Sequence, residues 1–234
     1  MIQVTSLASS SRGNAYTVTD GIVTLLLECG ISWKRTQKLL NFKTSEIAAC
    51  LVSHSHKDHC VAAADVMKAG IDVYASQETG NTLTQHHRLK VAKPLEKITI
   101  GSWAVLPFPT EHDCPGSMGF LLANSVGEKL LFATDTYYIR YKFSGLNVIM
   151  IECNYAADIL AEKVAAGHVP VGLRNRLLKS HFSLANVKEF LRANDLSQVK
   201  EIHLLHLSEG NSDSERFRRE VQEITGKPVY VADA

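Results

Sequence analysis

Long apolar runs are missing from this chain of 234 residues. No stretch approaches the ~20 apolar residues that a membrane-spanning helix needs. The N-terminal residues 1–5 also lack the basic start and apolar segment of a secretory signal. These absences favour a cytoplasmic protein that does not act in a membrane.

Cysteine is scarce and irregularly placed. The five cysteines are odd in number and never have the Cys-x-x-Cys spacing. This pattern disfavours both a disulfide framework and a zinc ribbon. We therefore expect free thiols at Cys29, Cys50, Cys60, Cys114 and Cys153.

Linkers rich in proline, glycine or serine are also absent, as are low-complexity tracts. The sequence thus gives no sign of an internal boundary, and a single domain over residues 1–234 is expected. Hydrophobic residues make up 45%, charged residues 21%, and the net charge is +1. This is the composition of an ordinary globular protein, and the overall charge gives no sign of a nucleic-acid partner.

Stretches typical of strands and of helices alternate along the chain. Asp20-Gly21 is a strong hairpin signal between strands at 15–19 and 22–28. Further strands are predicted at 2–7, 47–52, 71–75, 103–108, 119–123, 129–134, 148–152, 202–207 and 229–231. Helices are predicted from Ser32 to about Leu40, over 58–69, from Ser183 to Leu191, and from a capping box at Ser212 and Glu215 to Thr225.

The richest chemical signal is the pattern His-x-His-x-Asp-His, which follows the strand at 47–52. On an extended segment His54 and His56 point to one side and can share a metal ion, while Asp58 and His59 reach a second one. An incidental polar loop is disfavoured, because buried imidazoles and carboxylates cost several kcal/mol unless they have partners. The loop therefore predicts a dinuclear metal site.

More ligands are needed than one loop offers, and three later strands end on suitable side chains: His112, Asp135 and His206. Alone, each is better explained as a solvated or capping residue. Together they complete a ligand set, because the ends of neighbouring strands meet at one edge of a sheet. We predict that His54, His56 and His112 hold one divalent ion, that Asp58, His59 and His206 hold another, and that Asp135 bridges them. Such ligands accept zinc, manganese or iron.

The order of these motifs resembles that of the metallo-β-lactamase superfamily over nearly the whole chain. The segments at 6–16, 25–30, 151–154 and 205–208 resemble a branch of small bacterial and phage phosphodiesterases and exonucleases that typically act on DNA. The resemblance implies a four-layer αββα sandwich of two mixed sheets with helices outside. One departure concerns Glu28-Cys29-Gly30, where the family usually has Asp-x-Gly, so the longer Glu28 must make the hydrogen bond to the metal loop.

The predicted chemistry is hydrolysis by a hydroxide that bridges two zinc or manganese ions, since paired ions lower the pKa of water and neutralise charge on a phosphate. Asp58 is predicted to orient the nucleophile. His181 lies in a segment that resembles the family's Gly-His-Leu-Ser, and it is the candidate acid for the leaving alkoxide. A structural histidine beside a helix is the alternative.

The stretch from Lys163 to Lys188 contains several basic residues and no acidic ones. Arg174, Arg176 and Lys179 lie close to His181 in sequence and are candidates for binding phosphate, because a guanidinium can donate two hydrogen bonds to one phosphate. A solvated basic face is the alternative. Similarly, the segment at 9–14 either presents Arg12 to a substrate or forms a polar hairpin turn.

These signals predict a metal-dependent hydrolase that cleaves phosphodiester bonds, a nuclease that degrades DNA from an end. A hydrolase of small substrates, such as a cyclic phosphodiesterase, lactonase or thioesterase, would use the same metals and is the alternative. A non-catalytic nucleic-acid-binding protein is disfavoured, because the ligand set leaves metal positions open to water.

Overall fold

The computed structural model describes residues 1–232, and the chain divides into two compact units. The first unit contains residues 1–109 and 114–129. The second contains residues 110–113 and 130–232. The strands belong to two mixed sheets, one of six and one of seven strands.

The six-stranded sheet lies wholly in the first unit, with its strands in chain order. Its first three strands are antiparallel, and β3 to β6 are parallel. The predicted turn at Asp20-Gly21 joins β2 to β3, and the Asp20 carboxylate accepts two backbone hydrogen bonds there. The strands are β1 (Gln3–Ser10), β2 (Gly13–Thr19), β3 (Thr24–Leu27), β4 (Ile47–Leu51), β5 (Asp72–Ala75) and β6 (Leu89–Val91).

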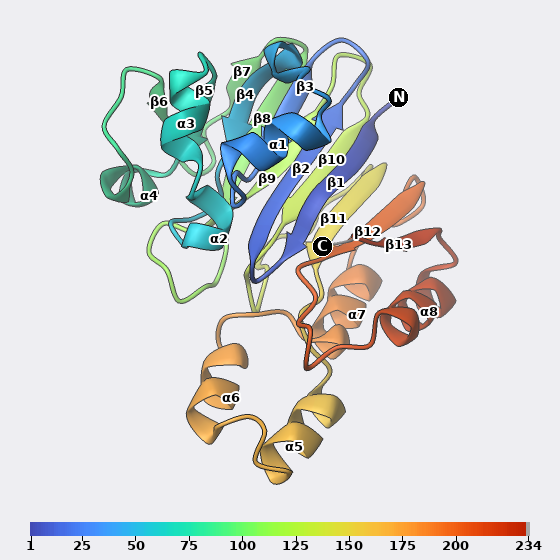
Figure 1. Ribbon diagram of the computed structural model, residues 1–234. Coiled ribbons are helices and arrows are strands. Elements are labelled where there is room, and N and C mark those ends of the chain that lie inside the picture. Colours follow the sequence, from blue (N-terminus) through green and yellow to red (C-terminus); the bar gives the residue numbers. More distant parts are fainter. Residues whose placement is uncertain (233–234) are drawn as a thin grey trace. The chain divides into compact units, whose positions relative to one another are not determined.

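Short helices accompany this sheet (Figure 1). They are α1 (Trp33–Leu39), the 3-10 turn η1 (Thr44–Glu46), α2 (Lys57–Cys60), α3 (Ala63–Lys68) and α4 (Gln77–Thr82). α3 packs on β5, and its buried Val66 and Met67 share a core with Leu26, Cys50 and Val73 of the sheet. Burial of these side chains fixes the end of β4, from which the histidine loop emerges.

The predicted helix over 58–69 is broken into α2 and α3. Cys29 explains the break, because its N–H donates to the carbonyl of His59 at 2.8 Å and its carbonyl accepts from Ala62 at 2.9 Å. These two hydrogen bonds tie the segment to the end of β3 in place of a continuous helical ladder. The loop is thereby held to the sheet at the residues that carry the metal motif.

The seven-stranded sheet has an antiparallel part in the first unit and a parallel part in the second. The antiparallel strands are β7 (Ile98–Ile100), β8 (Trp103–Pro109) and β9 (Met118–Ala123). The parallel strands are β10 (Lys129–Ala133), β11 (Val148–Glu152), β12 (Glu201–Leu205) and β13 (Val229–Val231). β11 is buried along its whole length, as a parallel strand covered on both faces should be.

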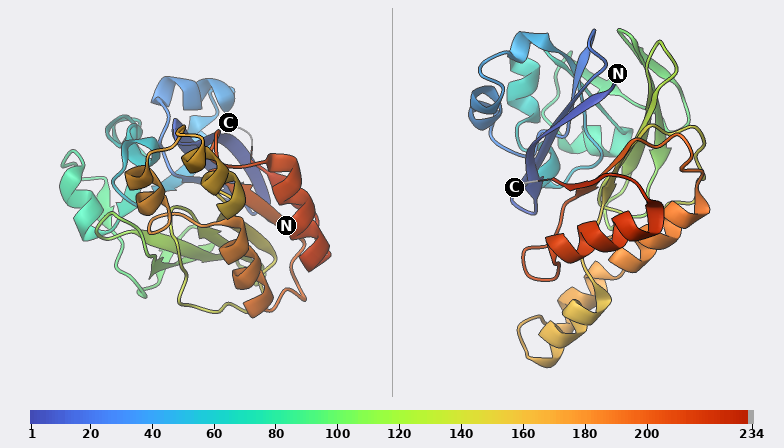
Figure 2. Two further views of the ribbon diagram at one scale, coloured as in Figure 1. Left: turned by 90° about the horizontal axis from the view of Figure 1, so that it is seen from below. Right: turned by 90° about the vertical axis from the view of Figure 1, so that its right-hand side faces the viewer.

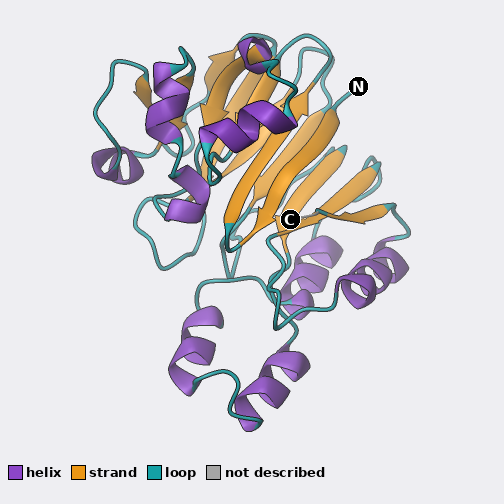
Figure 3. Ribbon diagram, in the orientation of Figure 1, coloured by secondary structure: helices purple, strands orange, loops and turns teal. Residues whose placement is uncertain are grey.

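Helices of the second unit are α5 (Ala157–Ala165), α6 (Val171–Leu177), α7 (Leu184–Ala193) and α8 (Ser214–Thr225). α7 and α8 lie side by side, and α8 packs on β13 (Figure 2). α5 and α6 form a separate helical pair, and every residue of α6 except Leu177 is exposed (Figure 3). The predictions missed α5, α6, β6 and β7, whose short or exposed segments carry little hydrophobic periodicity.

Helix starts were mostly predictable. The hydroxyls of Ser32 and Ser183 accept the backbone N–H three residues on, as predicted for α1 and α7. For α8 the predicted cap was wrong by one residue. Asp213 caps this helix, because the Ser212 hydroxyl donates instead to the carbonyl of Ser208 at 2.6 Å.

The five cysteines are free and buried, as predicted. Burial raises the pKa of the Cys60 thiol to about 12. Across residues 1–232, no helix combines the length and the apolar character needed to cross a bilayer.

Candidate metal centre

The histidine loop starts directly after β4 and presents two imidazoles to each other. His54 is buried, and its Nδ1 lies 2.8 Å from the hydroxyl of Ser53. Its Nε2 then faces Nδ1 of His56 at 3.1 Å. The alternation expected of an extended segment thus brings both ring nitrogens to one place.

Asp58 and His59 form a second pair at the start of α2. The side chain of His59 is fully buried, and its Nε2 lies 3.4 Å from Oδ2 of Asp58. The amide of Asn14 lies 3.1 Å from the same nitrogen and donates to the carbonyl of Asp58. Asn14 was not predicted as a site residue, and Arg12, the candidate of that segment, lies in the hairpin turn between β1 and β2.

Glu28 makes the hydrogen bond to the metal loop that is expected of the shorter aspartate usual in the family. It is fully buried, its Oε1 accepts the N–H of Ser53 at 3.0 Å, and its Oε2 lies 3.5 Å from Nδ1 of His59. Burial raises the pKa of Glu28, against the opposing effect of His59 and Ser53. The carboxylate therefore supports both ends of the metal loop at once.

Gly30 is required by the close approach of this loop. A Cβ at this position would lie 1.6 Å from the carbonyl oxygen of Asp58 and 2.8 Å from the backbone nitrogen of Asn14. No side chain fits there without moving the backbone that carries Asp58. The glycine of Glu28-Cys29-Gly30 thus has a steric reason.

In the second unit, Asp135 and His206 follow the ends of β10 and β12. Both are buried, and both have a left-handed backbone, with φ of 40° and 53°. Such conformations are costly for residues other than glycine and are concentrated at functional sites. Nε2 of His206 lies 3.3 Å from Oδ2 of Asp135.

His112 completes this group of ligand candidates. Its Nδ1 lies 2.7 Å from the carbonyl oxygen of Ser180, which can only accept a hydrogen bond. Nδ1 therefore donates this hydrogen bond, and Nε2, which lies 3.1 Å from Oδ1 of Asp113 and 3.8 Å from Oδ2 of Asp135, is the ring atom that can face a metal ion.

His181 lies beside the same carboxylate. Its Nδ1 is 3.8 Å from Oδ2 of Asp135 and 2.5 Å from Oε1 of Glu152. Burial favours the neutral ring, but the charge and hydrogen bond of Glu152 outweigh it and raise the pKa of His181 to about 9. This shift favours the protonated form of the imidazole.

Glu152 was not predicted as a site residue. It ends β11, is fully buried, and its Oε2 also accepts the backbone N–H groups of Thr136 and Phe182 at 3.0 and 3.1 Å. One carboxylate thereby fixes the loop after Asp135 and the loop that carries His181. An acidic residue at the end of an apolar strand was the available signal.

The donors in each unit have the spacing that a divalent ion requires. Two ligands of one tetrahedral zinc ion, each about 2.0–2.1 Å from it, lie about 3.4 Å apart. Three pairs match this spacing: His54 with His56 at 3.1 Å, Asp58 with His59 at 3.4 Å, and Asp135 with His206 at 3.3 Å. One donor atom each from Asp135, Glu152, His181 and His206 also lies within 4.8 Å of the others.

The basic candidates differ in their surroundings. Arg176, on α6, donates from Nε to Oδ2 of Asp113 at 2.6 Å. Asp113 directly follows His112 in the chain. Arg174 and Lys179 are exposed. Of these three candidates, Arg176 is therefore the one that pairs with the chain neighbour of a ligand candidate.

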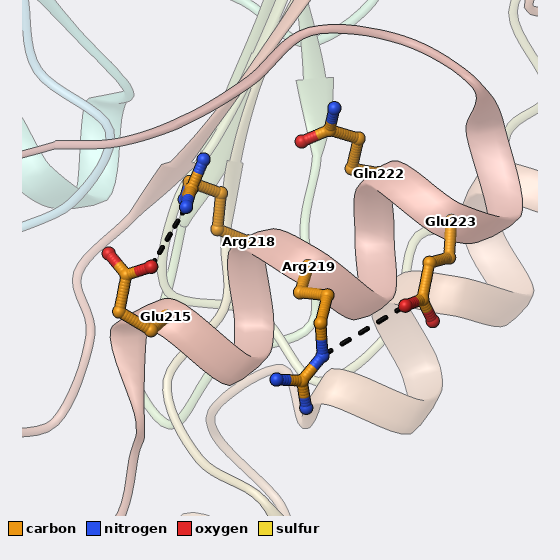
Figure 4. Close-up of a pocket in the computed structure, with 5 residues that line it drawn as sticks. All are labelled: Glu215, Arg218, Arg219, Gln222 and Glu223. Atoms are coloured by element: carbon orange, nitrogen blue, oxygen red, sulfur yellow. Dashed lines mark hydrogen bonds and ion pairs between the residues drawn. The ribbon is translucent and has the colours of Figure 1, made fainter.

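A shallow hollow along α8 does not resemble a catalytic site. Its charged side chains are taken up by ion pairs along the helix, between Arg218 and Glu215 at 2.8 Å and between Arg219 and Glu223 at 3.9 Å (Figure 4).

Known proteins with similar sequences and structures agree with the predicted family. A family model described as "Beta-lactamase superfamily domain" matches residues 24–206. Exodeoxyribonuclease YycJ of Bacillus anthracis is 27% identical over 93% of this chain and 87% of its own length. Exodeoxyribonuclease WalJ of Streptococcus pneumoniae is 26% identical, over 89% of this chain and 82% of its own.

A solved structure gives the fold. The metallo-beta-lactamase fold protein YhfI of Bacillus subtilis superposes with a TM-score of 0.71 and 16% identity, covering 100% of this chain and 97% of its own. This likeness, together with two mixed sheets flanked by helices, confirms the predicted αββα fold class.

Proposed function

Because the chain belongs to the beta-lactamase superfamily, we propose that it is a metal-dependent hydrolase that cleaves phosphodiester bonds of DNA from an end. The names of the exodeoxyribonucleases YycJ and WalJ support this substrate. The observation that carries the proposal is the position of His181, whose Nδ1 is held by Glu152 at 2.5 Å beside Asp135. A DNA strand leaves as an alkoxide, which needs a proton, and a phosphodiesterase therefore needs such an acid.

The proposed centre holds two divalent ions, zinc or manganese. The spacing of the donor pairs within each unit supports the assignment. The ions would supply a nucleophile at neutral pH and neutralise charge on the phosphate. The ligands are His54, His56, Asp58, His59, His112, Asp135 and His206.

The chain's own side chains have distinct roles in this proposal. His181 gives its proton from Nε2 to the leaving oxygen, since Nδ1 is engaged by Glu152. Asp58 orients the attacking water. Arg176, with Arg174 and Lys179, binds phosphates of the strand.

We propose that residues 1–234 act as one hydrolase domain, because the family match runs through both compact units. Free, buried thiols are typical of a reducing compartment, and a cytoplasmic location is part of the proposal.

A test compares a linear duplex with a closed circular duplex of the same sequence, after chelation and after return of zinc or manganese. We expect metal-dependent release of nucleotides from the linear DNA alone. Degradation of both forms would indicate an endonuclease. Turnover of bis-p-nitrophenyl phosphate without any DNA degradation would favour the small-substrate hydrolase.

A further inference from the structure

A hollow of about 370 Å³ lies in the second unit, between α7 and the segment Tyr137–Lys142, called here the tyrosine loop. Its size is in the range of small-ligand pockets. The rings of Phe182 and Phe190 form part of its wall, next to Asn186. The hollow is thus lined by aromatic rings with a few polar groups.

Both walls of this hollow continue from the candidate catalytic residues. Tyr137 is two residues after Asp135, and Phe182 directly follows His181. A group bound in the hollow would therefore lie beside the residues assigned to the reaction.

The tyrosine loop is held in place by hydrogen bonds of its backbone. The N–H of Tyr137 donates to the carbonyl of Glu111 at 3.0 Å, and its carbonyl accepts from the amide of Asn186 at 3.3 Å. The carbonyl of Tyr138 accepts from the Thr136 hydroxyl at 2.8 Å. A loop fixed in this way presents its rings with little loss of entropy on binding.

Two of these rings are open to solvent although tyrosine side chains are readily buried. The exposed fractions are 37% for Tyr137 and 54% for Tyr138. The loop also carries Arg140 and Lys142, but Arg140 pairs with Glu111 at 2.5 Å and Glu189 lines the opposite wall. Because the charges are largely balanced, the exposed rings are the distinctive feature, and flat aromatic rings suit stacking with nucleobases.

We propose that the tyrosine loop is a stacking subsite for an unpaired nucleotide at the end of the DNA strand that is being degraded. This inference rests on the proposed function and deepens it. An unpaired base at a strand end can leave the helix and stack on Tyr137 or Tyr138, which would position its phosphate toward the loop of Asp135. The enzyme would thereby prefer frayed or overhanging ends to closed ones.

The test uses the metal-loaded enzyme and a duplex with a short overhang that ends in 2-aminopurine. Methylphosphonate linkages at that end prevent cleavage. Stacking on a tyrosine changes the fluorescence of this base, and titration gives the affinity. The variants are Tyr137→Ala, Tyr138→Ala, the double variant, the conservative Tyr138→Phe, and Tyr230→Ala as a control that removes an exposed tyrosine of β13.

We expect each alanine variant that removes a stacked ring to weaken binding by about 5- to 150-fold and to abolish the fluorescence change. Tyr138→Phe should retain the affinity and the fluorescence change, because it keeps the ring. Tyr230→Ala should match the wild type in both. Equal affinity and equal fluorescence change in the double variant would overturn the subsite. If the wild-type enzyme degrades linear DNA in that case, only the subsite fails, whereas a wild type that degrades no DNA defeats the proposed function itself.

Discussion

Shortening Glu28 to aspartate should weaken the metal loop, although aspartate is the residue the family usually has there. The change removes one methylene, which withdraws the carboxylate by about 1.5 Å. The 3.0 Å contact with the N–H of Ser53 would then exceed about 4 Å, beyond hydrogen-bonding distance. The backbone of this chain places Glu28 for the longer side chain.

The expected cost can be worked out from these contacts. An unsatisfied buried N–H at Ser53 costs about 1–3 kcal/mol. The lost methylene adds about 0.8 kcal/mol of burial. We therefore expect Glu28→Asp to lower the free energy of unfolding by about 2–4 kcal/mol. Because His59 also loses its neighbour, metal affinity should fall by about 10- to 100-fold.

Urea unfolding of the chelator-treated protein measures the first effect, and competition with a chromophoric chelator measures the second. Glu28→Gln is the matched control, since it keeps the length and an oxygen for Ser53 but removes the charge beside His59. It should retain most of the stability and still lose metal affinity. Wild-type stability and metal affinity in Glu28→Asp would refute the role given to this side chain.

Four further outcomes are expected. His181→Ala should slow DNA hydrolysis by about 10²- to 10⁴-fold but should affect the hydrolysis of bis-p-nitrophenyl phosphate far less, because p-nitrophenolate leaves without a proton. Wild-type DNA turnover should decline as the pH rises past about 9, where His181 loses its proton. The variant should lack this decline. Asp135→Ala should abolish activity and leave fewer than two ions per chain by elemental analysis; full turnover with two ions would contradict the bridging role. Arg176→Ala should reduce the salt dependence of DNA binding by a slope of about 0.9, and an unchanged slope would remove it from the phosphate contacts. Ser183→Ala should cost about 1 kcal/mol in thermal unfolding through the lost cap of α7, and unchanged stability would contradict the role of this cap.

Much of the candidate site followed from the order of residues alone. The pattern at His54 to His59 predicted paired donors because side chains alternate along an extended segment, and the pairs formed within the loop as expected. Asp135 and His206 were predicted as ligands because polar residues that end apolar strands gather at the edge of a sheet. Their side chains lie 3.3 Å apart. Local hydrogen-bonding rules likewise placed Ser32 and Ser183 at helix starts.

Other features depended on contacts between residues far apart in the chain. Glu152 and Asn14 lie in segments that resemble the family, but their roles come from the atoms around them. Glu152 contacts His181 and two backbone N–H groups, and Asn14 contacts His59. The break between α2 and α3 arises from hydrogen bonds to Cys29, which local helix propensity cannot reveal.

The sequence by itself determined which side chains can bind metal, because ligand chemistry and strand periodicity are local properties. Only the tertiary structure decided how those side chains are held, which group contacts Nδ1 of His181, and where the tyrosine loop lies. Burial and hydrogen bonds to distant residues set these, and neither exists until the chain has folded.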